Sequence, residues 1–122
     1  MDTQSLVAIA DQIAAEPLYD AALCQAAFEG AQAHLPEVDE AMIRNGALGG
    51  TDAVLMVIDH GLPGWAISLQ GSASEVNGHW TCSLRRQDGR DDDPAMGVAK
   101  GPKLSNVMVA ALLKALTRKN LR

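Results

Sequence analysis

The spacing of apolar residues changes twice between residues 51 and 122, and this change limits the fold more than any other feature of the sequence. Residues 52–60 repeat apolar side chains at the period of a helix, residues 65–85 repeat them at the strand period of two, and residues 104–116 return to the helical period. Each of these segments has one apolar face to bury. We therefore expect two amphipathic helices to cover one face of an antiparallel sheet.

The middle part predicts three strands. Two runs alternate strictly, and the Asn77-Gly78 pair between them is typical of a hairpin turn. A polar, acidic loop over residues 87–94 follows, and Met96 and Val98 then indicate a short third strand. The predicted inward residues of the first two strands are Trp65, Ile67, Leu69, Trp80, Cys82 and Leu84.

The helices on either side of these strands have recognisable ends. Thr51 is a strong N-cap, Gly61 is placed for a left-handed stop, and Pro63-Gly64 predicts a turn. Gly101-Pro102 opens the last helix. Its predicted apolar stripe consists of Leu104, Val107, Met108, Ala111, Leu112, Ala115 and Leu116.

The first fifty residues are rich in alanine and predict three further helices. The first is capped by Asp2 or Thr3 and ends at Ala15, before Glu16-Pro17. The second runs from Leu18 to His34 with Asp20 in its first turn, and the third runs from Pro36 to Arg44. The glycine-rich residues 46–50 mark the best candidate boundary.

We therefore predict an α+β protein in which an N-terminal helical segment, residues 1–50, precedes a helix-βββ-helix sandwich, residues 51–122. The sandwich has two layers and a three-stranded antiparallel sheet. A length of 122 residues suits a single domain, so the two segments are expected to form one compact unit.

The net charge of −5 is unevenly distributed. Up to His79 there are eleven acidic residues and one basic residue, Arg44, whereas from Trp80 onward there are nine basic and four acidic residues. No apolar run is long enough for a membrane span, and the N-terminus lacks the basic opening of a signal peptide. With Cys24 and Cys82 as its two cysteines, the chain is expected to be cytoplasmic, with both thiols reduced.

No pattern in the sequence predicts a catalytic residue, a cofactor or a metal site. The histidines and cysteines lack the short spacings of zinc ligands. The acidic run Asp91-Asp92-Asp93 is contiguous and precedes Pro94, unlike a calcium-binding loop, and is read as solvated. The glycines at 46, 49 and 50 lack the Lys-Ser/Thr of a phosphate-binding loop. We expect a protein that is not an enzyme.

The basic C-terminal part leaves nucleic-acid binding open as an alternative. Helix, three strands and helix is also the chain order of domains that bind double-stranded RNA, although the dense lysine run expected at the start of the last helix is replaced by Leu104-Ser105-Asn106-Val107. The candidate residues for contacts with RNA or DNA are Arg85, Arg86, Lys100, Lys103, Arg118 and Lys119.

Several stretches resemble a known family. Thr51-Asp52-Ala53-Val54-Leu55, then Leu62-Pro63-Gly64-Trp65, a second tryptophan strand, and Ala110-Ala111-Leu112-Leu113-Lys114-Ala115-Leu116 are similar to the small phage ABA sandwich domain proteins of phages and bacterial chromosomes. The resemblance covers about residues 51–121. It implies the sandwich fold and a phage-like or prophage-derived origin, and it carries over no catalytic or ligand residue.

This resemblance and the lack of a chemical motif favour a non-enzymatic protein that acts through protein–protein contacts. The alanine-rich helices of residues 1–50 let other helices approach closely, either those of the same chain or those of a second copy. A homo-oligomer or another protein is therefore the expected partner.

Overall fold

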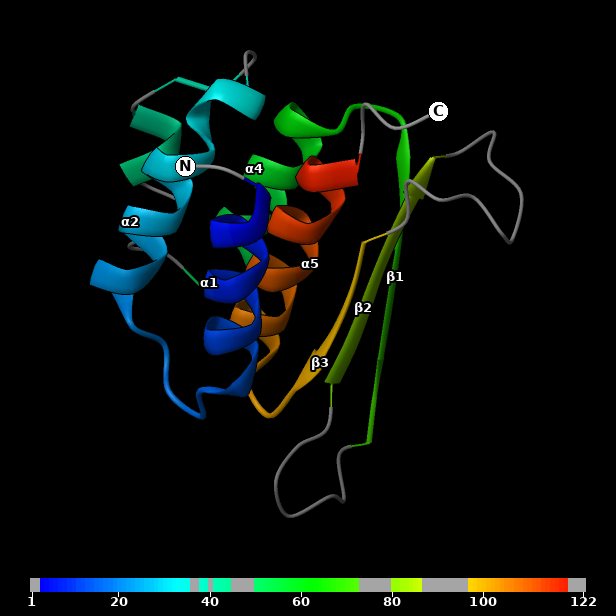
Figure 1. The fold of residues 1–122 in the computed structure, drawn as a ribbon. Helices are drawn as coiled ribbons and strands as arrows, with labels where there is room; N and C mark the ends of the chain where they lie inside the picture. The colour runs from blue at the N-terminus through cyan, green and yellow to red at the C-terminus, as the bar shows by residue number, and fades with distance from the viewer. Residues whose placement is uncertain are drawn as a thin grey trace.

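The computed structural model describes residues 3–35, 38–39, 41–44, 50–72, 80–86 and 97–118 (Figure 1). It confirms the α+β class and the three-stranded antiparallel sheet predicted from the sequence. The helices are α1 (Thr3–Ala15), α2 (Ala21–Ala31), the 3-10 turn η1 (Gln32–His34), α4 (Thr51–Gly61) and α5 (Leu104–Arg118). The strands are β1 (Trp65–Gly71), β2 (Trp80–Arg86) and β3 (Gly97–Gly101).

The strands lie in the order β1-β2-β3, so β2 is central and both pairings are antiparallel. The register places Ile67 beside Leu84 and Leu84 beside Gly97, on the face that the helices cover. As predicted, Cys82 and Leu84 of β2 are buried there. The last pair of β1 and β2 is Gly71 with Trp80, and the predicted Asn77-Gly78 turn lies outside the described residues.

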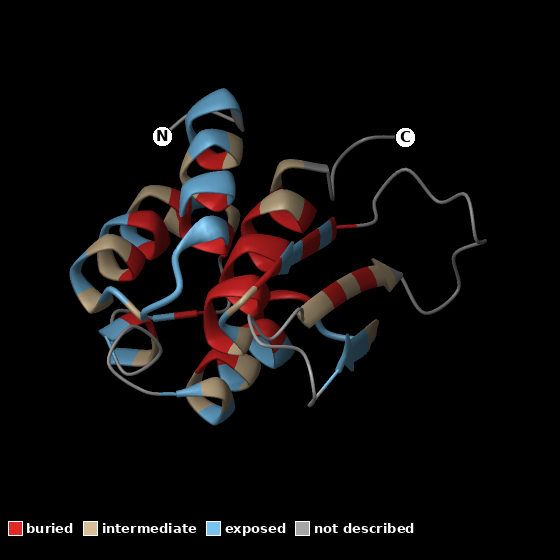
Figure 2. Cartoon of the chain, turned by 90° about the horizontal axis from the view of Figure 1, so that it is seen from below, coloured by how far each residue is buried: buried red, intermediate tan, exposed pale blue. Residues whose placement is uncertain are grey.

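Helix α5 lies at the centre of the protein (Figure 1). It packs on β2 and β3 on one side, and α1 and α4 pack on its other sides. The predicted apolar stripe lies in the core, from Val107 to Leu116, with Leu104 packed against it. Burial extends beyond the stripe to all of residues 105–113, and Figure 2 shows α5 buried along most of its length. A single hydrophobic cluster extends from Leu6 of α1 to Leu116 of α5 and includes Phe28 of α2.

The second and third helices begin later than predicted, because aspartates rather than prolines define their starts. Asp20 is the N-cap of α2, and its Oδ1 accepts a hydrogen bond of 3.0 Å from the Leu23 amide. Asp39 likewise accepts one of 2.9 Å from the amide of Met42, and residues 41–44 are helical. A short carboxylate side chain satisfies the unpaired amides of a first helical turn, which proline does not.

Helix α4 also differs at both ends from the prediction. Gly50 is its N-cap, without a side-chain hydrogen bond, and Thr51 is the first helical residue. Gly61 remains inside the helix, and the left-handed residue is Gly64, at φ 83°. A Cβ atom at Gly61 would lie 2.5 Å from Cδ2 of Leu35, so close packing, not a left-handed backbone, requires this glycine.

Two polar contacts tie α5 to the N-terminal helices. Asn106 is buried, and its Nδ2 donates hydrogen bonds to the backbone oxygens of Glu16 (3.0 Å) and Leu18 (2.9 Å) in the turn between α1 and α2. Lys114 of α5 forms an ion pair of 2.8 Å with Asp11 of α1. At this contact a basic residue of the C-terminal part neutralises an acidic residue of the N-terminal part within one molecule. None of the described helices combines the length and the apolar character that a membrane crossing needs.

Candidate functional site

The two edges of the sheet have different surroundings. At β3, helix α1 lies against the strand, and a Cβ atom at Gly101 would collide with the backbone carbonyl of Ala14. A Cβ atom at Gly97 would collide with the backbone of α5 at Ala111 and Ala115. The inward residues of β3 are therefore Gly97, Ala99 and Gly101, while Val98, which indicated this strand in the sequence, is exposed on the outer face.

At β1, the extensive contacts among the described elements are those with β2, and Trp65 and Ile67 also pack partly against the core. The burial of β1 falls along its length: Trp65, Ala66 and Ile67 are partly buried, and residues 68–71 are exposed, as Figure 2 shows. The side chain of Leu69 points to the helical side of the sheet, yet it remains 43% exposed. Helix α5 packs on β2 and β3, which leaves the inner face of β1 with little cover.

The sequence of β1, Trp-Ala-Ile-Ser-Leu-Gln-Gly, contains no charged residue and no proline. Edge strands of soluble proteins usually carry lysine, proline or a bulge, which prevent pairing with a further strand. At the far end of β1, the Trp80 indole lies where a Cβ atom of Gly71 would be, so the ring covers the glycine across the strand pair. The amide of Trp65 donates a hydrogen bond of 3.1 Å to the Leu62 carbonyl oxygen. Beyond it, residues 66–71 form an edge with no strand paired on its outer side among the described residues.

Of the six predicted nucleic-acid residues, the structure describes the side chains of Arg85, Lys100 and Lys103. Arg85 and Lys100 share the outer face of the sheet, but Lys100 pairs with Thr81, four residues along β2 from Arg85, a separation of about 13 Å. Lys103 is exposed in front of α5. Arg118 ends α5, the side chains of Arg86 and Arg118 are not described, and Lys119 lies outside the described residues.

The outer face of the sheet is mainly small and polar. Besides Arg85, Lys100 and Val98, its residues are Ala66, Ser68, Gln70, Thr81 and Ser83. Such a face offers hydroxyl and amide groups without an enclosed pocket.

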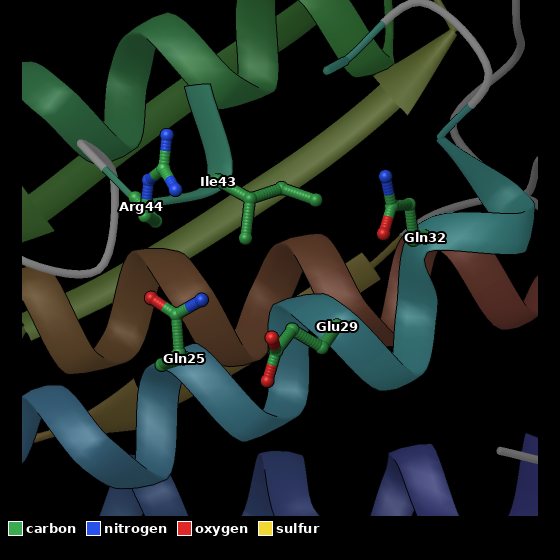
Figure 3. Close-up of a pocket in the computed structure, with 5 residues that line it drawn as sticks. All are labelled: Gln25, Glu29, Gln32, Ile43 and Arg44. Atoms are coloured by element: carbon green, nitrogen blue, oxygen red, sulfur yellow. The ribbon is translucent and has the colours of Figure 1, made fainter. Parts of the chain in front are cut away.

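A hollow lies between α2 and the helical residues 41–44 (Figure 3). Its volume is about 140 Å³, below the range of about 300–1,000 Å³ typical of pockets for small molecules. It is lined by Gln25, Glu29, Gln32, Ile43 and Arg44. These side chains come from the rims of two surface helices, and their polar ends do not converge on one point in Figure 3.

The described cysteines are buried and unsuited to nucleophilic chemistry. Burial raises the pKa of the Cys82 thiol to about 11. Burial also raises the pKa of Cys24, although a hydrogen bond from Tyr19 acts in the opposite direction. The pKa of Tyr19 is itself raised, chiefly by burial and then by its interaction with Cys24. A thiol must ionise to act as a nucleophile, so both cysteines are core residues at neutral pH.

The described histidines have structural surroundings. His60 lies at the end of α4, and its Nδ1 is 2.9 Å from the carbonyl oxygen of Met56 in the preceding turn. Across the described part of the chain, no three His, Cys, Asp or Glu side chains come together as a metal site would require.

The alanine-rich helices were expected to pack onto the sandwich or onto a second copy, and the structure shows the first of these. Ala10, Ala14, Ala27 and Ala31 pack into the protein's own core, which accounts for many of the small residues. The uncharged alternating run that forms β1 is visible in the sequence. Whether this strand lies at an edge of the sheet depends on the strand order, which the run does not show. Comparisons of the chain with protein-family models, with curated proteins and with solved structures gave no match.

Proposed function

We propose that this protein acts through protein–protein contacts, and that its contact site is the open edge of β1. The observation that carries the proposal is an uncharged edge strand of seven residues with Leu69 43% exposed on its inner face. An extended segment of a partner adds to such an edge by main-chain hydrogen bonds, and the alternate side chains of the strand provide specificity.

The side chains of β1 support this role. On the inner face, Ile67 and Leu69 give a partner strand an apolar surface to cover. On the outer face, Ser68 and Gln70 keep the unbound edge hydrated. The proposed role involves no catalysis, and the burial of both thiols supports it.

The resemblance to phage ABA sandwich proteins over residues 51–121 supports a phage-like or prophage-derived bacterial origin. The proposed location is a reducing cytoplasm, which the two free, buried thiols of Cys24 and Cys82 support. A strand-addition protein of this size would act as a small adaptor.

The test compares Leu69→Lys with Met56→Lys. Both replace an exposed apolar side chain by lysine, but Met56 lies on the outer side of α4, away from the sheet. We expect Leu69→Lys to weaken association at least about tenfold, because a buried ammonium at a strand interface is costly, and Met56→Lys to leave it unchanged. The readouts are sedimentation velocity of the pure protein and amide exchange of β1 in bacterial lysate. Equal behaviour of both variants, with β1 unprotected throughout, would overturn the proposal.

A second candidate function is binding of RNA or DNA, which Arg85 and Lys100 on one outer face favour. It predicts salt-sensitive binding to duplexes that Arg85→Gln and Lys100→Gln each weaken without changing the fold. A gel shift at low salt tests this. A result showing no retarded band for RNA or DNA duplexes would remove this candidate.

A further inference from the structure

We propose that the partner at the β1 edge is a second copy of this chain, joined by antiparallel β1–β1 pairing about a two-fold axis at Ser68. This inference rests on the proposed function, because it identifies the occupant of the same edge. The two three-stranded sheets would then form one continuous six-stranded sheet.

The register follows from the position of the strand. Ser68 is the central residue of β1, Trp65–Gly71. In a symmetric antiparallel pair centred there, each residue faces the residue equally far on the other side of Ser68. Ile67 then faces Leu69, Ala66 faces Gln70, and Trp65 faces Gly71, each pair occurring twice.

These pairs are self-complementary in size and in character. The two Ile67–Leu69 pairs bring aliphatic side chains together on the inner face, where directly opposed residues are close enough to stabilise a sheet. Each of the other two pairs sets a large side chain against a small one. Gly71 already carries the Trp80 indole across it, so the partner's Trp65 would arrive beside a second aromatic ring.

The absence of charge in β1 removes the usual obstacle to self-pairing. A two-fold axis brings a strand close to its own copy, so a charged residue near its centre would face a like charge. In β3, by comparison, Lys100 is charged and α1 lies against the strand.

The exposed inner face of β1 also gains cover in this arrangement. The two-fold axis of an in-sheet antiparallel pair is perpendicular to the sheet, so both helical layers lie on the same side. Ile67 and Leu69 of the two copies then form one apolar cluster between the layers. The 43% exposure of Leu69 in the single chain is the part of this cluster that the second copy would bury.

Cysteine cross-linking tests the register directly. In Ser68→Cys the two new thiols would be directly opposed, within the Cα separation that a disulfide requires. In Ala66→Cys they would be four residues out of register, about 13 Å apart along the strands. Both positions lie on the outer face, outside the core, and the natural Cys24 and Cys82 are buried. A mixture of Ala66→Cys with Gln70→Cys provides the matched positive control, because those residues face each other.

Under mild oxidation we expect Ser68→Cys to form a covalent dimer at least about tenfold faster than Ala66→Cys alone. We expect the mixture to form only the mixed dimer. Equal cross-linking of Ser68→Cys and Ala66→Cys, or a dimer in sedimentation that Ser68→Cys does not trap, would overturn the β1–β1 pairing. A monomer at all concentrations, without cross-linking, would also overturn it. Protection of β1 amides in lysate would in that case still support strand addition by another protein.

Discussion

The two edge strands of one sheet have opposite designs. Strand β3 turns glycine and alanine toward the core, so that the backbones of α5 and α1 approach it closely. Strand β1 turns Trp65, Ile67 and Leu69 toward the same side, where Trp65 and Ile67 pack partly against the core and Leu69 stays 43% exposed. Small residues thus face the core at the edge that α1 and α5 cover, and larger uncharged residues face it at β1, the edge where we propose that a further strand binds.

This difference is the basis of our proposal that the sheet is closed at β3 and binds a further strand at β1. The central helix α5 is surrounded by β2, β3, α1, α4 and α2. A further strand or subunit at β1 would add cover where α5 does not reach. The three predictions below probe this contrast, in order of decreasing effect.

The largest loss of stability is expected from a substitution at Gly97 of β3, the edge strand that α1 and α5 cover. In Gly97→Ala the added methyl group meets the backbone of α5 at Ala111 and Ala115, which cannot move aside like a side chain. We expect the free energy of unfolding to fall by about 3 kcal/mol, measured by urea denaturation. Gly50→Ala is the matched control, because nothing lies within 4 Å of its added Cβ, and its loss should stay below about 1 kcal/mol. Equal losses would mean that α5 does not press on β3.

Unfolding at alkaline pH tests whether water is excluded from Cys82, which lies between Leu69 of β1 and Ala99 of β3 in the sheet. Its pKa is raised from 9.0 to about 11, so the unfolded chain releases this proton at lower pH than the folded one. The buried neutral thiol of Cys82 contributes its full stabilisation below pH 9. This contribution to the free energy of unfolding falls by roughly 2 kcal/mol as the pH rises toward 11.

The measurement is the difference in unfolding free energy between the wild type and Cys82→Ala as a function of pH. This difference cancels the contributions of Tyr19 and Cys24, which have the same sign. A difference that stays constant from neutral pH to pH 11 would show that water reaches Cys82 past the open edge.

The smallest effect concerns Asn106, which holds the turn after α1 and so keeps α1 along β3. Asn106→Ala removes two hydrogen bonds to the exposed turn, and the unpaired buried Oδ1 disappears with them. We expect a net loss of about 1 kcal/mol in thermal or urea unfolding, and faster amide exchange in β3 but not in β1. The neighbouring exposed Lys103→Ala should change neither quantity. An unaltered β3 in Asn106→Ala would contradict the role given to α1.

Much of the secondary structure could be predicted from periodicity, because the helices and strands here have regular apolar faces. The inward residues of β2 are correct for this reason. The prediction failed at β3, where the packing of a neighbouring helix decides which residues face the core. Val98 was the apolar signal for β3, yet glycine faces the core there because a helix backbone needs the space.

The site was harder to predict than the fold. The helix caps Asp20 and Asp39 could be predicted from the chemistry of their side chains. The need for glycine at position 61 could not, because it arises from close packing against Leu35, a residue far away in the sequence. An edge strand is defined by which strands lie beside it, so the run from Trp65 to Gly71 could not be identified as open from its sequence alone. The distance between Arg85 and Lys100 on the outer face depends on the sheet register, which a sequence pattern does not show.

Amide hydrogen exchange of β1 and β3, measured in the same sample at increasing protein concentration, tests the central claim most directly. The account predicts that exchange in residues 65–71 slows as the concentration rises, while exchange in residues 97–101 stays constant. Leu69→Lys should abolish the slowing. Exchange in β1 that is independent of concentration, in the wild type as in Leu69→Lys, would contradict the claim that the open edge joins two copies of this chain.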